Sequence, residues 1–110
     1  MDIDAAVTAH IDRFNDAVRA GDYTDFVDTF SDDAVMSFDG VPVGPFRGRS
    51  EILRAYQAQP PTSTLTARSV DEVAPGLARV SFDWDEGGSG TMQIGFTGAD
   101  VSELRIAFDA

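Results

Sequence analysis

The sequence predicts an α+β fold, with helices packed on one face of a mostly antiparallel sheet. In most of the first 58 residues, apolar residues recur at intervals of three and four, which is typical of helices with one buried face. From residue 62 onward they recur at every second position, which is typical of strands with one buried face. Because the helices come first and most strands follow, the α+β class is favoured over an alternating arrangement.

The first helix is predicted to begin near Ile3 and to end before Gly21. Its apolar stripe follows helical spacing and consists of Ile3, Val7, Ile11, Phe14 and Val18. Gly21 fits the position just after a helix, where a left-handed backbone conformation is common. We therefore expect this helix to lie with its stripe against the sheet.

A second, shorter helix is predicted directly afterwards. Asp22 is the expected N-cap, and Asp25 three residues later completes a weak analogue of a capping box. The inner face of this helix would carry Phe26, Val27 and Phe30. Residues 31–33, a serine followed by two aspartates, are expected to end it.

A short strand over Ala34–Phe38, a turn at residues 39–40 and an extended connection over residues 41–46 come next. Two prolines in the connection favour an edge or a linking segment over a central strand. A third helix is predicted from residues 48–50 to the proline pair at 60–61, with Ile52, Leu53 and Tyr56 on its apolar side.

The rest of the chain is predicted to form a meander of about four strands. Extended stretches cover residues 62–74, 77–85, 91–96 and 104–108, and a glycine-rich hairpin loop is expected at 87–90. Alternation of apolar and polar residues gives these strands one apolar face. The aromatic residues and methionine expected to face inward are Phe14, Phe38, Tyr56, Phe82, Trp84, Met92, Phe96 and Phe108.

Composition excludes several classes of function. The 110 residues hold 19 acidic and 8 basic residues, all of the latter arginine, for a net charge of −11. Without lysine there is no Schiff base, and without cysteine there is no thiol nucleophile, disulfide or thiolate metal site. The acidity argues against binding nucleic acid or an anionic membrane surface. The length fits one domain over residues 1–110, and the acidic start, unlike a signal peptide, favours a cytoplasmic protein.

The order of elements and three connecting motifs resemble a known superfamily. The motifs are AGD at residues 20–22, FSDDA at 30–34 and GPFRGR at 44–49. They resemble the nuclear transport factor 2-like superfamily, especially its SnoaL-like and ketosteroid-isomerase-like branch. The resemblance implies a cone, in which a curved, mostly antiparallel sheet wraps around three N-terminal helices and leaves a pocket at its open end. It also implies that a homodimer is common, whereas the reaction is not fixed by the fold.

The resemblance also allows the isomerase mechanism to be checked residue by residue. Ketosteroid isomerases use a general-base aspartate and an oxyanion hole formed by a tyrosine and a protonated aspartate. The positions that match here are occupied by Phe38, by Phe14 and, over a turn of different length, by about Met92. Two hydrogen-bond donors and the base are thus replaced by apolar side chains. Steroid isomerisation by that mechanism is not expected.

Two polar residues are candidates for other chemistry in the pocket. Asp39 follows the position of the family's base by one residue, but a step of one residue along a strand turns the side chain to the other face. The simpler interpretation is an Asp-Gly turn. His10 is the single histidine and lies one turn before Phe14. Histidine suits general acid–base catalysis, although an ordinary helix residue among acidic neighbours is the simpler interpretation.

Three functions follow from these patterns. The first is binding of a small apolar or aromatic molecule, without a cofactor or a metal, by Phe14, Phe38, Tyr56, Trp84, Met92 and Phe108. The second is a divergent isomerase, cyclase or dehydratase that uses Asp39 or His10 as its base. The third is dimerisation or partner binding through the outer face of the sheet, which would carry Thr91, Gln93, Glu103 and Arg105. The sequence is equally compatible with an interior that bulky side chains fill completely.

Overall fold

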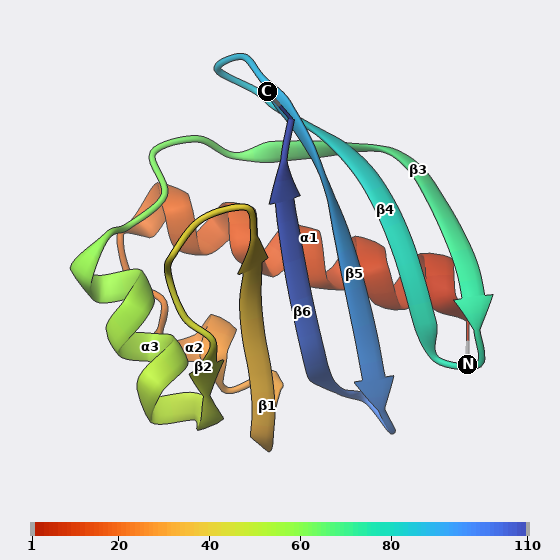
Figure 1. Ribbon diagram of the computed structural model, residues 1–110, viewed down its shortest axis with the longest axis horizontal. Coiled ribbons are helices and arrows are strands. Elements are labelled where there is room, and N and C mark those ends of the chain that lie inside the picture. The colour runs from red at the N-terminus through yellow and green to blue at the C-terminus, as the bar shows by residue number, and fades with distance from the viewer. Residues whose placement is uncertain (1, 110) are drawn as a thin grey trace.

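The structure, a computed structural model, describes residues 2–109 and confirms the predicted α+β class. It contains six strands, preceded and interrupted by helices (Figure 1). In these residues the helices are α1 (Ile3–Ala20), α2 (Thr24–Val27) and α3 (Gly48–Ala58), and the strands are β1 (Phe30–Asp39), β2 (Phe46–Arg47), β3 (Leu65–Ala74), β4 (Leu77–Trp84), β5 (Ser89–Thr97) and β6 (Asp100–Phe108).

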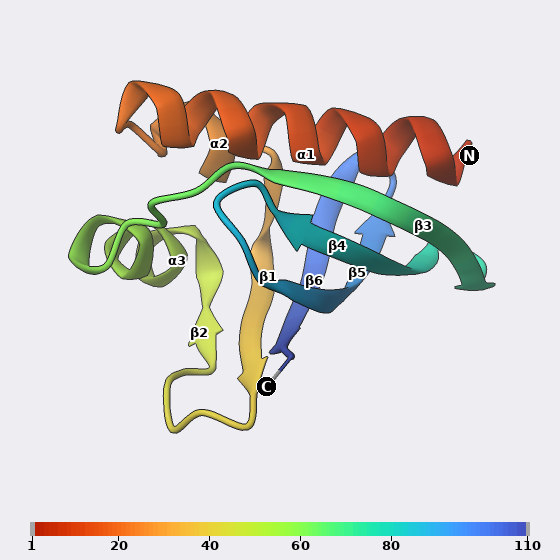
Figure 2. The same ribbon diagram turned by 90° about the horizontal axis from the view of Figure 1, so that it is seen from above.

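The six strands form one curved, unclosed sheet in the order β2-β1-β6-β5-β4-β3. All neighbouring strands are antiparallel except β1 and β6, which run parallel. Seen from above, the sheet bends around the concave side on which α1 lies (Figure 2). Helix α1 packs against β3 and β4, and α3 packs against β1 and β2. This is the cone that the resemblance implied.

The core lies between α1 and the concave face of the sheet. The predicted stripe of α1 is buried at Ile3, Val7, Ile11 and Phe14. It faces alternate residues of the central strands, whose fully buried members include Val80, Phe82, Ile94 and Leu104. Full burial of one such side chain stabilises the fold by roughly 1.5–3 kcal/mol. The predicted helix ending is also present, because Gly21 adopts a left-handed backbone with φ of 69° and its N–H donates to the carbonyl of Ala17.

The second helix is shorter than predicted, and Phe30 is not part of it. Its N-cap is Tyr23 rather than the predicted Asp22, although the Asp22 carboxylate accepts a hydrogen bond from the backbone N–H of Thr24, at 3.0 Å. However, α2 ends at Val27, and Phe30 begins β1 as a fully buried strand residue. Pairing with β6 explains the difference, since Phe30 aligns with Val101, whose N–H donates to the Thr29 carbonyl. A strand partner distant in sequence thus overrides the local turn signal at residues 31–33.

The predicted glycine-rich loop is also shorter, because Ser89 and Gly90 belong to β5. Gly90 pairs with Phe82 on one side and with Phe108 on the other. A Cβ at this position would lie 2.6 Å from the carbonyl oxygen of Ala107 and 2.9 Å from the Phe82 ring. The glycine is therefore required by the close approach of neighbouring strands rather than by loop flexibility.

The inward-facing set is confirmed for most of its members, and two of them are less buried than a core position would require. The ladder between β5 and β6 shifts register between Gly95 and Phe96, so Phe96 is only partly buried. Phe108, at the end of β6, remains 47% exposed. Its ring lies at the open end of the cone rather than in the packed core.

Candidate functional site

A cavity of about 1230 Å³ occupies the open end of the cone. Its walls come from α1, α3 and the concave face of the sheet, and its rim includes the β1–β2 connection and the β4–β5 hairpin. Cavities that hold small organic molecules commonly measure 300–1,000 Å³, so this one has room for such a ligand. The interior is therefore open, and bulky side chains do not close it.

All six residues predicted to form the binding wall line this cavity. They are Phe14, Phe38, Tyr56, Trp84, Met92 and Phe108. Three of the rings form a row at the open end, in which Phe108 stacks on Phe38 at 6.0 Å and on Trp84 at 6.4 Å between ring centres. The interplanar angles are 10° and 21°. Nearly parallel rings at the mouth offer flat apolar faces to a ligand.

Part of the cavity wall was not predicted from the sequence. Val41 and Val43, in the connection between β1 and β2, line the cavity and are 40% and 44% exposed. Phe46 also lines it and meets Phe38 edge-on at 6.4 Å. The available signal was the spacing of Val41 and Val43 in a segment rich in turn residues. Nothing in the spacing itself showed that the segment folds over the pocket.

His10 lies in the buried part of the cavity wall. It is 4% exposed and packs against the rings of Phe26 at 5.1 Å and Phe30 at 6.0 Å. Burial and, to a smaller extent, the positive charge of Arg13 together lower the pKa of His10 to about 4. The imidazole is therefore neutral near pH 7. The interpretation as an ordinary surface residue of the helix is wrong.

Asp39, the other candidate base, lies outside the cavity. The residues that line the cavity within 2–109 include Met36 and Phe38 of β1 but not Asp39. Its carboxylate points to the opposite face of the sheet, where both oxygens accept from the Nε of Arg105 at 2.8 and 3.0 Å. Asp39 is therefore not placed to act as a base in the cavity, because β1 keeps the alternation that separates it from Phe38.

Tyr56 brings a second polar group to the buried wall. It is 6% exposed and stacks on Tyr23 with 5.0 Å between ring centres. Burial raises the pKa of Tyr56, and the neighbouring Tyr23 adds to the effect. Its phenol therefore stays protonated over the physiological range. Together with neutral His10, this leaves the deep wall uncharged.

The charged lining residues lie at the mouth. Glu51 and Arg54 of α3 and Glu86 of the β4–β5 hairpin are all exposed. The Glu51 carboxylate accepts from the backbone N–H of Arg47, and the Arg54 Nε donates to the carbonyl of Ser50. Charge is thus confined to the water-facing rim, and the polarity of the site increases from the deep end to the mouth.

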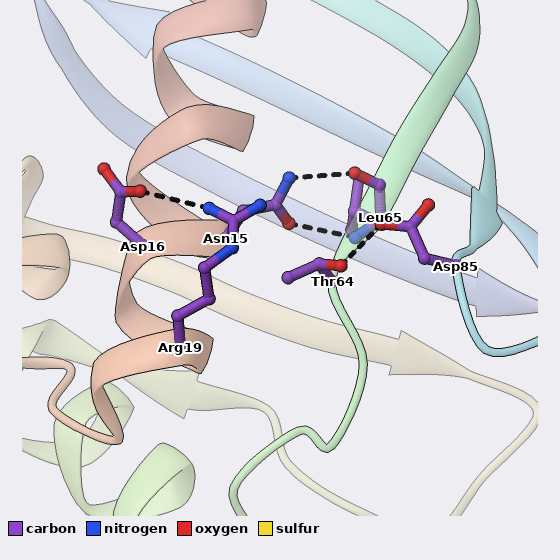
Figure 3. Close-up of polar contacts among 6 residues, drawn as sticks. All are labelled: Asn15, Asp16, Arg19, Thr64, Leu65 and Asp85. Carbon is purple, nitrogen blue, oxygen red and sulfur yellow. Dashed lines mark hydrogen bonds and ion pairs between the residues drawn. The ribbon is translucent and has the colours of Figure 1, made fainter.

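The Asn15 side chain connects α1 to β3 beside the cavity. The Asn15 amide donates to the carbonyl of Leu65 and accepts from the N–H of Leu65, each at 2.9 Å (Figure 3). The residue before Leu65, Thr64, donates from its hydroxyl to the Asp85 carboxylate at 2.5 Å. Asn15 is adjacent to Phe14 in the chain, and Asp85 is adjacent to Trp84. These bonds therefore hold Phe14 in place relative to Trp84. Their ring centres are 6.3 Å apart.

Residues 2–109 hold no group of three or more histidine, cysteine or carboxylate side chains arranged to bind a metal ion. None of the helices among these residues is long and apolar enough to cross a membrane.

Comparison with known proteins places the chain in a family. Residues 11–106 match the SnoaL-like domain family. The chain belongs to the SnoaL-like domain family. No curated protein matches the sequence.

Solved structures show the same fold at low sequence identity. A SnoaL-like protein of unknown function from Burkholderia thailandensis has a TM-score of 0.75 and 15% identity, with 96% of each chain covered. A protein from Mycobacterium tuberculosis in complex with estradiol-17beta-hemisuccinate has a TM-score of 0.72 and 12% identity, with 94% of each chain covered. A computationally designed 17-OHP binder has a TM-score of 0.71 and 11% identity, with 94% of this chain and 91% of that chain covered. These likenesses establish the fold.

Proposed function

We propose that this SnoaL-like domain binds a small, largely apolar molecule in the cavity at the open end of the cone. The observation that carries the proposal is the cavity of about 1230 Å³ lined by Phe14, Phe38, Trp84 and Phe108. Keeping such a cavity open costs dispersion contacts that a filled interior would gain. A ligand that fills it recovers those contacts. Two solved proteins of the same fold, one in complex with estradiol-17beta-hemisuccinate and one a designed 17-OHP binder, support a small molecule as the ligand.

The arrangement favours binding over catalysis. A general base works best when its pKa lies near the working pH, whereas burial holds the pKa of His10 near 4. No carboxylate among residues 2–109 is hydrogen-bonded to the imidazole to raise its basicity. Asp39 is engaged by Arg105 on the other face of the sheet. The apolar residues Phe14, Phe38 and Met92 at the positions of the isomerase groups support the same conclusion.

A cavity-filling variant tests the proposal. Trp84 is the single tryptophan and lines the cavity, so its fluorescence reports on a bound molecule. We expect flat apolar compounds such as fluorene to change this fluorescence and to raise the thermal midpoint of the wild-type protein. Ala55→Phe places a ring in the cavity from α3 and should weaken binding at least tenfold while the protein stays folded.

Ala20→Phe is the matched control, because it adds the same ring at an exposed position of α1 outside the cavity. This variant should bind fluorene as the wild type does. Equal binding by both variants would place the ligand elsewhere. No response of the wild type to any of a panel of apolar ring compounds would contradict the proposed function.

Two expectations from the sequence stay predictions. One is a homodimer formed through the outer face of the sheet, where Gln93 pairs with Arg105 in register and Arg105 binds Asp39. The mass in solution, measured by light scattering over a range of concentrations, tests it, and Gln93→Glu should shift the equilibrium toward monomer by adding a charge to that face. The other is a location in the cytoplasm, which cell fractionation tests.

A further inference from the structure

The deep end of the cavity holds a polar group that the protein itself does not satisfy. Nδ1 of His10 is sealed from solvent and has no hydrogen-bond partner; it is the one such side-chain nitrogen or oxygen in residues 2–109. Burying a polar group without a partner is costly, so native structures seldom retain one without a reason. An apolar residue at this position would avoid that cost. Because Nδ1 is sealed from solvent, a ligand cannot reach it, and a partner from outside the protein can meet only the other ring nitrogen.

The other ring nitrogen, Nε2, opens toward the cavity. Nε2 also makes no hydrogen bond within residues 2–109. Unlike Nδ1, however, it is not sealed and keeps some accessible surface. The side chain is 96% buried with respect to the surface and lines the cavity, so the surface that Nε2 keeps faces the cavity. A partner for this nitrogen must come from whatever occupies the cavity.

The protonation of the ring determines which partner fits. A neutral imidazole carries one N–H and one lone pair. Buried N–H groups without an acceptor are rarer than acceptors without a donor, so the sealed Nδ1 is better placed as the lone-pair nitrogen. The proton then lies on Nε2 and points into the cavity. This tautomer donates one hydrogen bond to an acceptor on the ligand.

The surroundings select a neutral acceptor. The rings of Phe26 and Phe30 pack against the imidazole, and the phenol of Tyr56, across Phe26 from it, stays protonated. An ionised group on the ligand would lose its water in this apolar end without an opposite charge against it, because the lining charges Glu51, Arg54 and Glu86 are at the exposed mouth. A carbonyl or hydroxyl oxygen meets the donor without that cost.

We propose that His10 is a ligand-binding residue that donates a hydrogen bond from Nε2 to a neutral carbonyl or hydroxyl oxygen at the buried end of an otherwise apolar ligand. This inference rests on the proposed function and adds the orientation and chemical class of the ligand. The oxygen enters first, the apolar body lies along the cavity wall that Phe14 and Trp84 form, and the other end reaches the mouth.

A pair of probes with the same shape tests the inference. Fluorenone is fluorene with a carbonyl at the central carbon, so the two compounds differ by one hydrogen-bond acceptor. The wild-type protein should bind fluorenone more tightly than fluorene by about 3- to 10-fold, the typical net effect of one hydrogen bond. His10→Leu keeps a similar volume but has no donor. It should remove the preference for fluorenone and leave the affinity for fluorene within about twofold.

Phe14→Leu is the matched control, because it shortens a cavity residue one turn along the same helix without touching a donor. It should weaken both probes by the same factor. If the wild type binds both probes equally, or if His10→Leu keeps the preference, the inference is wrong while the proposed function stands. If neither probe binds, both are wrong for this class of ligand.

A direct measurement covers the case in which His10→Leu does not fold. His10 is the single histidine, so imidazole ¹⁵N resonances in a histidine-labelled sample belong to it alone. We expect the neutral tautomer protonated at Nε2, and a shift of the Nε2 signal on adding fluorenone but not fluorene. A ring protonated at Nδ1, or equal shifts with both probes, would overturn the inference.

Discussion

At the scale of single residues, His10 and Asn15 show what the sequence pattern does and does not reveal. Both lie beside the apolar stripe of α1. Spacing alone assigns no partner. The burial of His10 depends on Phe26 and Phe30, which come from α2 and β1. The bonds of Asn15 depend on Leu65, fifty residues away in the chain. Contacts of this kind appear only when distant segments have been brought together.

The burial of His10 predicts a pH dependence of stability. The pKa of its side chain is about 4 in the folded protein and 6.5 in the unfolded chain, so the unfolded chain binds the proton more readily. The contribution of neutral His10 to the free energy of unfolding is complete above pH 6.5. It is lost as the pH falls from 6.5 to 4, and its total is on the order of 3 kcal/mol. Urea unfolding at pH 7 and pH 4.5 should therefore show a smaller loss of stability in His10→Leu than in the wild type.

The opposite finding would be a loss of the same size in both proteins. In that case the carboxylates alone would account for the acid sensitivity, and the imidazole would not be buried in solution. The comparison is clean because the carboxylate content of the two proteins is identical.

The Asn15 amide predicts a loss of stability on truncation. Asn15→Ala removes a donor and an acceptor together and leaves the partly buried N–H and carbonyl of Leu65 without partners. We expect a decrease of about 1–3 kcal/mol in the free energy of unfolding. Asp16→Ala is the neighbouring control; its exposed ion pair with Arg19 contributes less than about 0.5 kcal/mol. Chemical denaturation of both variants gives the comparison, and equal effects would count against the role of Asn15.

At the scale of elements, helices and strands with one dominant periodicity were predicted well. Strand boundaries that depend on hydrogen bonding to a neighbouring strand were predicted less well. The stripe of α1 and the alternation along β4 are long and regular, and both elements are present as predicted. The start of β1 and the start of β5 were missed because local signals there, two aspartates and three glycines, indicate turns. In both places the ladder of a neighbouring strand outweighs the local preference.

Gly90 allows a test of this point within one strand. Gly90→Ala would set a Cβ 2.6 Å from the carbonyl oxygen of Ala107, so the backbone must shift, with an expected cost of roughly 1–3 kcal/mol. At Gly95 of the same strand, a Cβ would be 3.4 Å from its nearest atoms. Gly95→Ala should therefore cost much less. Thermal unfolding followed by circular dichroism distinguishes the two variants, and a harmless Gly90→Ala would mean that β5 and β6 separate more readily there than the structure indicates.

At the scale of the whole molecule, the fold followed from the sequence, and part of the site did. The succession of elements and the motifs at residues 20–22, 30–34 and 44–49 predicted the cone, and all six expected wall residues line the cavity. The volume of the cavity did not follow, because a row of aromatic residues is compatible with a filled interior as well as an open one. Nor did the contribution of the β1–β2 connection, whose path is set by tertiary packing.

The net charge predicts a response to salt. Residues 1–40 carry ten acidic and two basic side chains, a balance of −8 within the total of −11. Exposed like charges repel one another in the compact state, and salt screens this repulsion over a distance of about 10 Å at 0.1 M. The midpoint of thermal unfolding should therefore rise between 10 mM and 200 mM sodium chloride. A midpoint that falls over this range would show that ion pairs such as Asp32 with Arg49 outweigh the repulsion.

The parallel pairing of β1 with β6 has a consequence for folding during translation. The first long strand lies between the two-residue β2 and the last strand of the chain, with Phe38 aligned to Ile106. A chain still emerging from the ribosome can form α1 and the hairpin of β3 and β4, but β1 has no long neighbour until β6 has been synthesised. Contacts between the two ends of a chain form slowly because a long loop must close first. The cavity, which both strands line, can therefore form only after β6 has been synthesised.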